Sequence, residues 1–253
     1  MLKLKSKIFE KYKDKLVYGI TDKKDGNMSA KFDKVEIVTK RREKVLKRFG
    51  FSLNDIVLLE QKHTANVQVV GKKHLGFALN NESPFNPADA LITKEKNIVL
   101  GIFIADCLPI FFYDPKKEII ALAHAGWRGL YKGILKNVIK KFKNLGSQTK
   151  NILVFIGPSI GPCHYNVGEE LIQAFKRKYR FLGESFYRKL KGTFYLDLWK
   201  IAKLILLNGG LKSKNIEISK ICTYCHKNLF SHRKNKNKRE KPGIMFAFFA
   251  IKN

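Results

Sequence analysis

The chain has 253 residues, of which 45% are hydrophobic, so a sizeable core can form and disorder of its bulk is excluded. Its net charge of +29 has two interpretations. It indicates either an anionic partner, such as nucleic acid, a membrane surface or a phosphorylated substrate, or a lysine-rich surface without a dedicated partner. Because the lysines are scattered through every segment and do not form one stripe, the second interpretation is favoured.

Periodic apolar patterns along the chain predict a mixed α/β fold in a single domain, residues 1–253. In chain order they predict a helix at residues 41–49, strands at 97–104, 110–113 and 119–124, a helix at 130–144, a strand at 152–156, a helix at 168–177, a strand at 194–196, a helix at 198–207, and strands at 216–221 and 244–251. A turn at Asp114-Pro115 joins two of these strands as a hairpin, which favours mixed sheets over a parallel sheet. Residues 231–242, rich in Lys, Arg and Asn, are expected to form an exposed, mobile loop.

No targeting segment is expected. Residues 1–5 alternate between apolar and charged side chains, and no continuous apolar run follows them. The longest apolar runs, such as residues 244–251, are too short to span a bilayer. We therefore expect a cytoplasmic protein without a membrane partner, whose four cysteines serve as ligands, nucleophiles or buried residues and not as disulfides.

Three segments each offer one metal-ligand side chain: His63, Cys107 and His124. Cys107 and His124 each end an apolar, strand-like run. Two imidazoles and one thiolate suit zinc, with copper as the alternative, and leave a fourth position open, as in catalytic zinc sites. The three residues are far apart in the sequence, so only the fold can bring them together.

Neighbours of these ligands are further candidates. Asp106 is next to Cys107, where it can cap a turn or orient a neighbouring imidazole from outside the ligand set. Arg128 follows a glycine-bearing turn at the start of a helix-like stretch, a setting suited to a phosphate group. The alternative for Arg128 is an ordinary surface arginine.

Six motifs then occur in the order of one known family: residues 61–67, 88–93, 105–109, 123–129, 157–163 and 222–223. In combination they resemble the YfiH-type laccase-domain family, whose members were first labelled polyphenol oxidases and later described as purine nucleoside phosphorylases. The resemblance covers about residues 60–230.

The resemblance implies a four-layer α/β/β/α fold with mixed β-sheets, and zinc or copper bound by His63, Cys107 and His124. It also implies phosphorolysis of adenosine, inosine and 5'-methylthioadenosine, with adenosine deamination as a side activity. The partners would then be a purine nucleoside and phosphate. Two further roles rest on the residues alone: Arg128, Lys62 and Gln61 would bind phosphate or substrate, and Asp106 would shuttle the proton of deamination.

The chain departs from the family pattern in three places. Residues 21–29 lack the arginine that precedes a Gly-Gly turn, although Lys23 or Lys24 can supply a charge there. Asn166 replaces an acidic residue, and Pro242-Gly243-Ile244 replaces a Gly-Arg pair. These changes bear on efficiency and substrate choice more than on the fold.

Other functions remain open. A copper-dependent phenol oxidase is disfavoured because no methionine is near the motifs and the chain has only six histidines. A cysteine hydrolase would use Cys107 as nucleophile and His124 as base, and editing of peptidoglycan precursors is a related alternative. Nucleic-acid binding by residues 231–239 is weighed against a solvated loop, which is favoured. The sequence leaves open whether the chain is a monomer or a homodimer.

The segment from Cys222 to His226 matches the c-type haem attachment pattern, but such attachment requires export. A second metal or redox site would need Cys163 and His164 to complete it, and nothing in the sequence brings them near. We therefore expect Cys222 and Cys225 to belong to the packing at a strand end.

Overall fold

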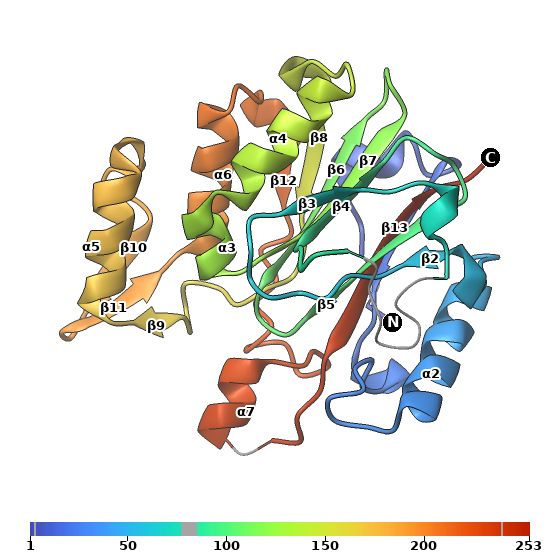
Figure 1. The fold of residues 1–253 in the computed structure, drawn as a ribbon. Helices are drawn as coiled ribbons and strands as arrows, with labels where there is room; N and C mark the ends of the chain where they lie inside the picture. The colour runs from blue at the N-terminus through green and yellow to red at the C-terminus, as the bar shows by residue number, and fades with distance from the viewer. Residues whose placement is uncertain (3, 77–84, 239) are drawn as a thin grey trace.

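The computed structural model describes residues 1–2, 4–76, 85–238 and 240–253, and Figure 1 gives its elements. The strands are β1 (Leu16–Ile20), β2 (Ile56–Val57), β3 (Val67–Val69), β4 (Ala90–Thr93), β5 (Val99–Ile104), β6 (Leu108–Asp114), β7 (Ile119–Ala125), β8 (Leu153–Ile156), β9 (Asn166–Val167), β10 (Tyr187–Leu190), β11 (Thr193–Leu196), β12 (Ile216–Ile218) and β13 (Met245–Ile251). The helices are α1 (Lys7–Glu10), α2 (Val35–Lys47), α3 (Trp127–Lys132), α4 (Ile134–Asn144), α5 (Glu169–Lys178), α6 (Leu198–Asn208) and α7 (His232–Lys238).

Two large sheets pack face to face, and helices cover their outer faces (Figure 1). The six-stranded sheet has the order β12-β8-β6-β7-β4-β3, and the four-stranded sheet has the order β1-β13-β5-β2. Both sheets contain parallel pairs at an edge, such as β3–β4 and β2–β5, and antiparallel pairs at the centre, such as β6–β7 and β5–β13. The predicted four-layer mixed α/β fold is therefore confirmed.

The central strands are apolar on both faces because both faces are covered. In β13, Phe246 and Phe248 pack with α2 on the outer face, whereas Phe249 packs between the two sheets. In β6, Phe112 belongs to the core under the helices and Phe111 to the core between the sheets. Burial of each such phenylalanine stabilises the fold by roughly 2–3 kcal/mol. Because side chains alternate between the two faces of a strand, this burial determines which face of each strand packs against which layer.

Two of the predicted helices differ from the observed ones. Helix α2 begins at Val35, earlier than the predicted start at residue 41. The predicted helix at residues 130–144 is two helices, α3 and α4, because Gly133 between them has a φ of 98°. Glycine adopts this left-handed conformation without the steric cost of a β-carbon.

The prediction of a loop at residues 231–242 is wrong for its first half, because helix α7 spans His232–Lys238. The hydroxyl of Ser231 accepts a hydrogen bond from the backbone N–H of Lys234 at 3.1 Å, and its carbonyl accepts one from Asn235 at 2.9 Å. A serine in this position satisfies the free N–H groups of a helix start, which offsets the modest helix propensity of the residues that follow.

Cys107 does not end a strand. Strand β5 ends at Ile104 and Cys107 directly precedes β6, in which Pro109 is the second residue. The carbonyl of Pro109 accepts a hydrogen bond from the N–H of Gly157 at 2.9 Å, and a proline is tolerated near the start of a strand. The thiol therefore lies in the tight connection between the two large sheets.

A third sheet, with the order β10-β11-β9, lies with α5 to one side of the layers (Figure 1). It fixes Tyr165, which precedes β9 and whose carbonyl accepts a hydrogen bond from the N–H of Leu196 at 2.9 Å. Among the described residues, no helix combines the length and the apolar character that a membrane crossing requires.

Candidate active site and metal centre

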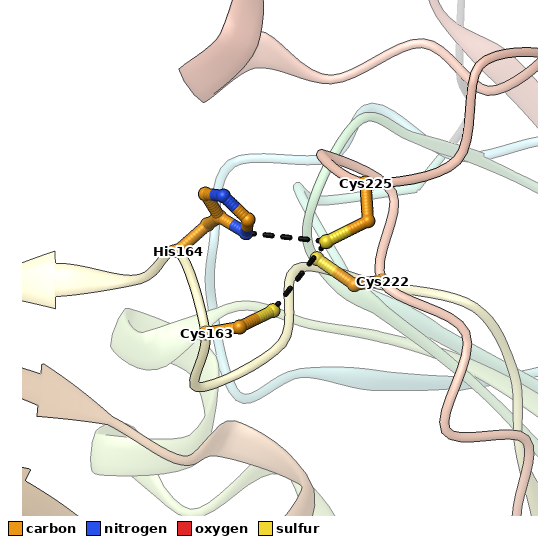
Figure 2. A group of neighbouring side chains, drawn as sticks. All are labelled: Cys163, His164, Cys222 and Cys225. Carbon is orange, nitrogen blue, oxygen red and sulfur yellow. Dashed lines mark hydrogen bonds between the residues drawn. The ribbon is translucent and has the colours of Figure 1, made fainter.

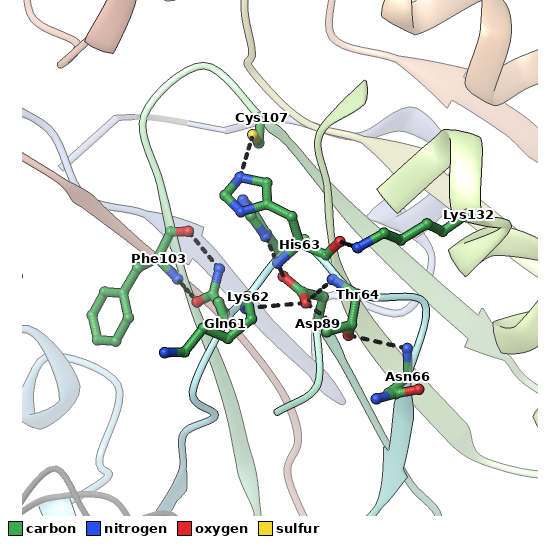
Figure 3. Close-up of polar contacts among 10 residues, drawn as sticks. Gln61, Lys62, His63, Thr64, Asn66, Asp89, Phe103, Cys107 and Lys132 are labelled. Atoms are coloured by element: carbon green, nitrogen blue, oxygen red, sulfur yellow. Dashed lines mark hydrogen bonds and ion pairs between the residues drawn. The ribbon is translucent and has the colours of Figure 1, made fainter. Parts of the chain in front are cut away.

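The three predicted ligands converge on one point. His63 comes from the loop before β3, Cys107 from the connection before β6, and His124 from β7. Their ligand atoms all lie within 4.8 Å of one another, and the Sγ of Cys107 is 3.9 Å from the Nε2 of His63 (Figure 3). Two nitrogens, or a nitrogen and a sulfur, bound to one tetrahedral zinc ion are about 3.3–3.6 Å apart, so the observed 3.9 Å needs only a small shift of the side chains. This donor set therefore fits a zinc-sized ion.

Asp89 positions two of these ligands without being one of them (Figure 3). Its fully buried carboxylate lies 2.7 Å from the Nδ1 of His124 and accepts hydrogen bonds from the backbone N–H groups of His63 and Thr64 at 3.1 and 2.6 Å. The Nδ1–H of His124 therefore points to Asp89, and its Nε2 is left for the centre. Asp89 lies in the sequence motif at residues 88–93, but its role becomes visible only in the fold.

His63 has a φ of 54°, an unusual backbone conformation for a residue with a side chain. The carboxylate of Asp89 holds its N–H, and the Nζ of Lys132 donates a hydrogen bond to its carbonyl at 2.9 Å. Strained conformations of this kind persist where the surroundings hold them, and they are concentrated at functional sites.

The thiol of Cys107 and the imidazole of His124 shift each other's pKa. Burial alone would raise the pKa of Cys107, but the adjacent His124 and His63 lower it to about 7. Burial alone would lower the pKa of His124, but the Cys107 thiolate and the Asp89 carboxylate raise it to about 9. Burial likewise opposes ionisation of Asp89, yet hydrogen bonds from His124 and Thr64 keep its pKa below the usual value. Cys107 and His124 thus each favour the charged form of the other.

Gly126 leaves the space that the centre needs. A β-carbon on this residue would lie 2.6 Å from the Sγ of Cys107 and 3.3 Å from the Cδ2 of His63. The first distance is shorter than van der Waals contact allows. The close approach of the β7–α3 turn to both ligands therefore requires glycine here.

A cavity of about 770 Å³ opens beside the three ligands, which is the size of a site for a nucleoside-sized molecule. Among the described residues that line it, the cationic ones are Lys31, Arg42, Arg128 and Arg233, and the aromatic ones are Phe103, Trp127 and Tyr165. Its two acidic residues already have partners. Glu60 pairs with Lys62, and Asp106 accepts hydrogen bonds. The cavity therefore offers positive charge and aromatic surface together.

The phosphate and substrate candidates differ in position. Arg128 lines the cavity, and its guanidinium lies 4.4 Å from the ring centre of Trp127. Lys62 is largely exposed, is not among the lining residues, and has its Nζ 2.7 Å from Glu60. Gln61 lines the cavity, but both ends of its amide bond the backbone of Phe103, at 2.6 and 2.9 Å (Figure 3). Gln61 thus fixes the loop that bears His63.

Asp106 bonds segments other than the two histidine ligands, and the carboxylate that orients the imidazole of His124 is that of Asp89. The carboxylate of Asp106 accepts hydrogen bonds from the hydroxyl of Thr223 at 2.6 Å and the N–H of Arg233 at 2.7 Å. Its backbone has a φ of 92°, and its carbonyl accepts a hydrogen bond from Ile160 at 2.9 Å. Asp106 thereby joins two loops and the start of α7 next to Cys107.

His232 and Arg233, from the basic segment, line the cavity. The guanidinium of Arg233 lies 5.1 Å from the ring centre of Tyr165 and donates to the carbonyl of Asn166 at 2.9 Å. It also contacts the side-chain amide of Asn166, the residue that departs from the family pattern. The neutral amide of Asn166 does not offset the charge of Arg233 as an acidic residue would.

Comparison with known proteins identifies the family. A family model described as multi-copper polyphenol oxidoreductase laccase matches residues 20–252, so the chain belongs to this family. Purine nucleoside phosphorylase YlmD of Bacillus subtilis (strain 168) is 34% identical over 223 residues, which cover 87% of this chain and 79% of the relative. Adenosine deaminase RL5, from an unknown prokaryotic organism, is 32% identical over 190 residues, which cover 74% of this chain and 72% of the relative.

The fold agrees with a solved structure of the same family. The crystal structure of YlmD from Geobacillus stearothermophilus superposes with a TM-score of 0.88 at 30% identity, and the match covers 98% of this chain and 94% of that chain. The predicted resemblance is therefore confirmed.

Proposed function

We propose that this protein is a zinc-dependent purine nucleoside phosphorylase that cleaves adenosine, inosine and 5'-methylthioadenosine, with adenosine deamination as a second activity. The observation that supports this most directly is the convergence of His63, Cys107 and His124 beside a cavity rich in cationic and aromatic side chains. Relatives named as a purine nucleoside phosphorylase and an adenosine deaminase support the same two reactions.

Zinc is the metal we propose for His63, Cys107 and His124, because a thiolate and two imidazoles are ligands that it favours. When bound, zinc supplies Lewis acidity and positive charge at one open coordination position. The contact between Asp89 and the Nδ1 of His124 supports this assignment, because it leaves the Nε2 of His124 to face the metal. Copper accepts the same ligands, and elemental analysis of the purified protein distinguishes the two metals.

Phosphorolysis breaks the bond between C1' of the ribose and the purine while a phosphate oxygen forms a new bond to C1'. The enzyme must therefore hold a phosphate dianion next to a neutral nucleoside. Arg128 is our choice for the phosphate, since its guanidinium lines the cavity and can bind two phosphate oxygens. Lys62 is the second candidate, although its Nζ is paired with Glu60.

The purine needs a flat apolar surface and stabilisation of the charge that develops as it leaves. Phe103, Trp127 and Tyr165 provide aromatic surface in the cavity. For deamination, a carboxylate must move protons at the exocyclic amine. We assign this role to Asp106, whose Oδ1 and Oδ2 each accept one hydrogen bond and retain a second lone pair.

The decisive experiment measures purine release from adenosine and inosine, with and without phosphate, on wild type and Cys107→Ala of known zinc content. We expect phosphate-dependent release from wild type and a loss of at least 100-fold in Cys107→Ala, together with loss of the zinc at this centre. Arg128→Ala should raise the KM for phosphate more than Lys62→Ala does. An active Cys107→Ala protein without zinc at this centre would overturn the proposal.

A cysteine hydrolase is the principal competing function, because the lowered pKa of Cys107 also suits a nucleophile. The two functions respond differently to alkylation. A zinc-bound thiolate resists iodoacetamide until a chelator removes the metal, whereas a free nucleophile is modified at once. Immediate, chelator-independent labelling of Cys107 with loss of activity would favour the hydrolase.

A further inference from the structure

We propose that Cys163, His164, Cys222 and Cys225 form a second metal site, a structural zinc site separate from the catalytic centre. The sequence analysis expected Cys222 and Cys225 to be strand-end packing, but the fold brings Cys163 and His164 next to them (Figure 2). The two clusters share no residue. The inference does not depend on which reaction the protein catalyses.

The four ligand atoms lie close to the spacing of ligands around one zinc ion. All lie within 4.8 Å of one another. The Sγ atoms of Cys163 and Cys225 are 3.6 Å apart, and the Sγ of Cys225 is 3.2 Å from the Nδ1 of His164 (Figure 2). In a tetrahedral Cys3His site with ordinary bond lengths, neighbouring ligand atoms are about 3.5–3.8 Å apart. Such a site has four protein ligands and no open position, which is typical of structural zinc.

The backbone around the sulfurs also fits a thiolate site. Cys222 and Cys225 have the two-residue spacing of zinc-binding turns, and the chain between them forms a tight turn. The N–H of Gly161 donates a hydrogen bond to the Sγ of Cys222 at 3.2 Å, an interaction that stabilises a metal-bound sulfur from outside the ligand set. The ring of His164 stacks on Tyr224 with ring centres 4.0 Å apart, which fixes the direction of its Nδ1.

A disulfide or a haem explains the cluster less well. A disulfide between Cys163 and Cys225 would require their sulfurs to approach to about 2.05 Å. It would also not explain why His164 and Cys222 lie in the same cluster. A c-type haem would be attached through Cys222 and Cys225 alone, yet both sulfurs lie against residues of the other loop. A four-ligand cation accounts for all four positions.

The proposed ion would fasten together two loops that build the cavity. One loop continues from His164 to Tyr165, which lines the cavity. The other continues from Cys222 to Thr223, whose hydroxyl donates to Asp106 next to Cys107. Backbone pairing of Thr223 with Ser159 at 3.0 Å already links the loops. The second zinc would therefore stabilise the wall of the cavity without touching the substrate.

The test is the zinc content of the purified full chain, measured by mass spectrometry of the metal, for wild type and single variants. We expect about two zinc ions per chain in wild type, one in Cys225→Ser, one in Cys107→Ala, and none in the double variant. His226→Asn is the matched control, because His226 follows Cys225 but is outside the cluster, and it should retain two. Cys225→Ser should also unfold at a lower temperature than wild type.

X-ray absorption at the zinc edge of wild type tests the site even if Cys225→Ser does not fold. Both sites filled give an average of about two sulfur ligands per zinc, whereas the catalytic site alone gives about one. One zinc per chain in both wild type and Cys225→Ser would overturn the inference, as would a Cys163–Cys225 disulfide in the intact mass of the purified protein. Neither result would bear on Cys107 and the proposed reaction.

Discussion

At the scale of single residues, Asp89 is the group on which the geometry of the proposed metal centre depends. Its carboxylate bonds the Nδ1 of His124 and the backbone of the loop that bears His63, so two ligands from distant segments share one anchor. Outer carboxylates of this kind fix the tautomer of a histidine ligand and raise its basicity. Next to Cys107, the carboxylate of Asp106 bonds Thr223 and the backbone of Arg233.

We predict that Asp89→Asn lowers zinc affinity at the catalytic centre by about 10- to 100-fold, because an amide cannot accept all the hydrogen bonds that the carboxylate does. The affinity is measured by competition with a zinc-binding dye in the Cys225→Ser background, so that one site is titrated. Asp114→Asn is the control, since Asp114 is equally buried but lies at the far end of β6. An equal loss of affinity in both variants would contradict the assigned role.

Zinc affinity should also depend on pH, because the metal displaces protons from its ligands. Below pH 7 both Cys107 and His124 hold a proton, and between about 7 and 9 only His124 does. Affinity should therefore rise by up to about 100-fold per pH unit below pH 7 and about tenfold per unit from 7 to 9, and then level off. The same dye competition from pH 6 to 10 measures this, and a flat profile between 7 and 9 would contradict the shifted pKa of His124.

At the scale of elements, the connection from β7 to α3 determines how closely the layers approach at the centre. His124 is the last residue but one of β7, and Gly126 follows the strand as the first residue of the turn into α3. This turn lies against Cys107 from the neighbouring strand connection and against the loop of His63. A change in one residue of the turn therefore reaches all three ligands.

We predict that Gly126→Ala lowers zinc affinity at least tenfold while the protein stays folded, because the added methyl group would overlap the Sγ of Cys107. Gly129→Ala, three residues further on in α3, is the matched control. Its β-carbon would meet its nearest neighbour at 3.4 Å, which is ordinary contact, and alanine favours the helix by about 1 kcal/mol. Zinc content and circular dichroism of the two variants check the prediction, and unchanged zinc affinity in Gly126→Ala would refute it.

At the scale of the whole molecule, part of the net charge of +29 lies around the cavity. Lys31, Arg42, Arg128 and Arg233 line it from distant parts of the chain, and its two acidic residues are paired or hydrogen-bonded. The guanidinium of Arg42 is buried and donates to the carbonyl of Met28, so it contributes a fixed charge. An anion that approaches the cavity therefore meets a positive potential.

The KM for phosphate should accordingly rise several-fold between 0.05 and 0.5 M of an inert salt, because the Debye length shrinks from about 14 Å to about 4 Å over that range. The KM for inosine, which is neutral, should change little and is the internal control. Steady-state kinetics at fixed pH and fixed zinc content measure both. A phosphate KM that does not respond to salt would show that the surrounding charges do not attract the substrate.

Much of the fold could be predicted from the sequence, because the central strands are continuously apolar, a pattern typical of a sheet that is covered on both faces. Strands β5, β6, β7 and β13 lie within about two residues of their predicted bounds. The prediction was wrong where one residue decides the local conformation: Gly133 divides a helix in two, and Ser231 starts the helix α7 in a segment expected to be a loop.

The sequence by itself determined the residue types of the chemistry: two histidines and a cysteine next to apolar strands, in motifs typical of one family. Which carboxylate serves which ligand was decided only by the tertiary structure. Asp106 is adjacent to Cys107 in the chain but bonds Thr223, whereas Asp89 reaches His124 across the pair β4–β7. The cluster that contains Cys163 and Cys225 is likewise formed only by the tertiary structure. Hydrogen bonds and metal bonds act over about 2–4 Å in space, and positions far apart in the sequence become neighbours only once the sheets have packed.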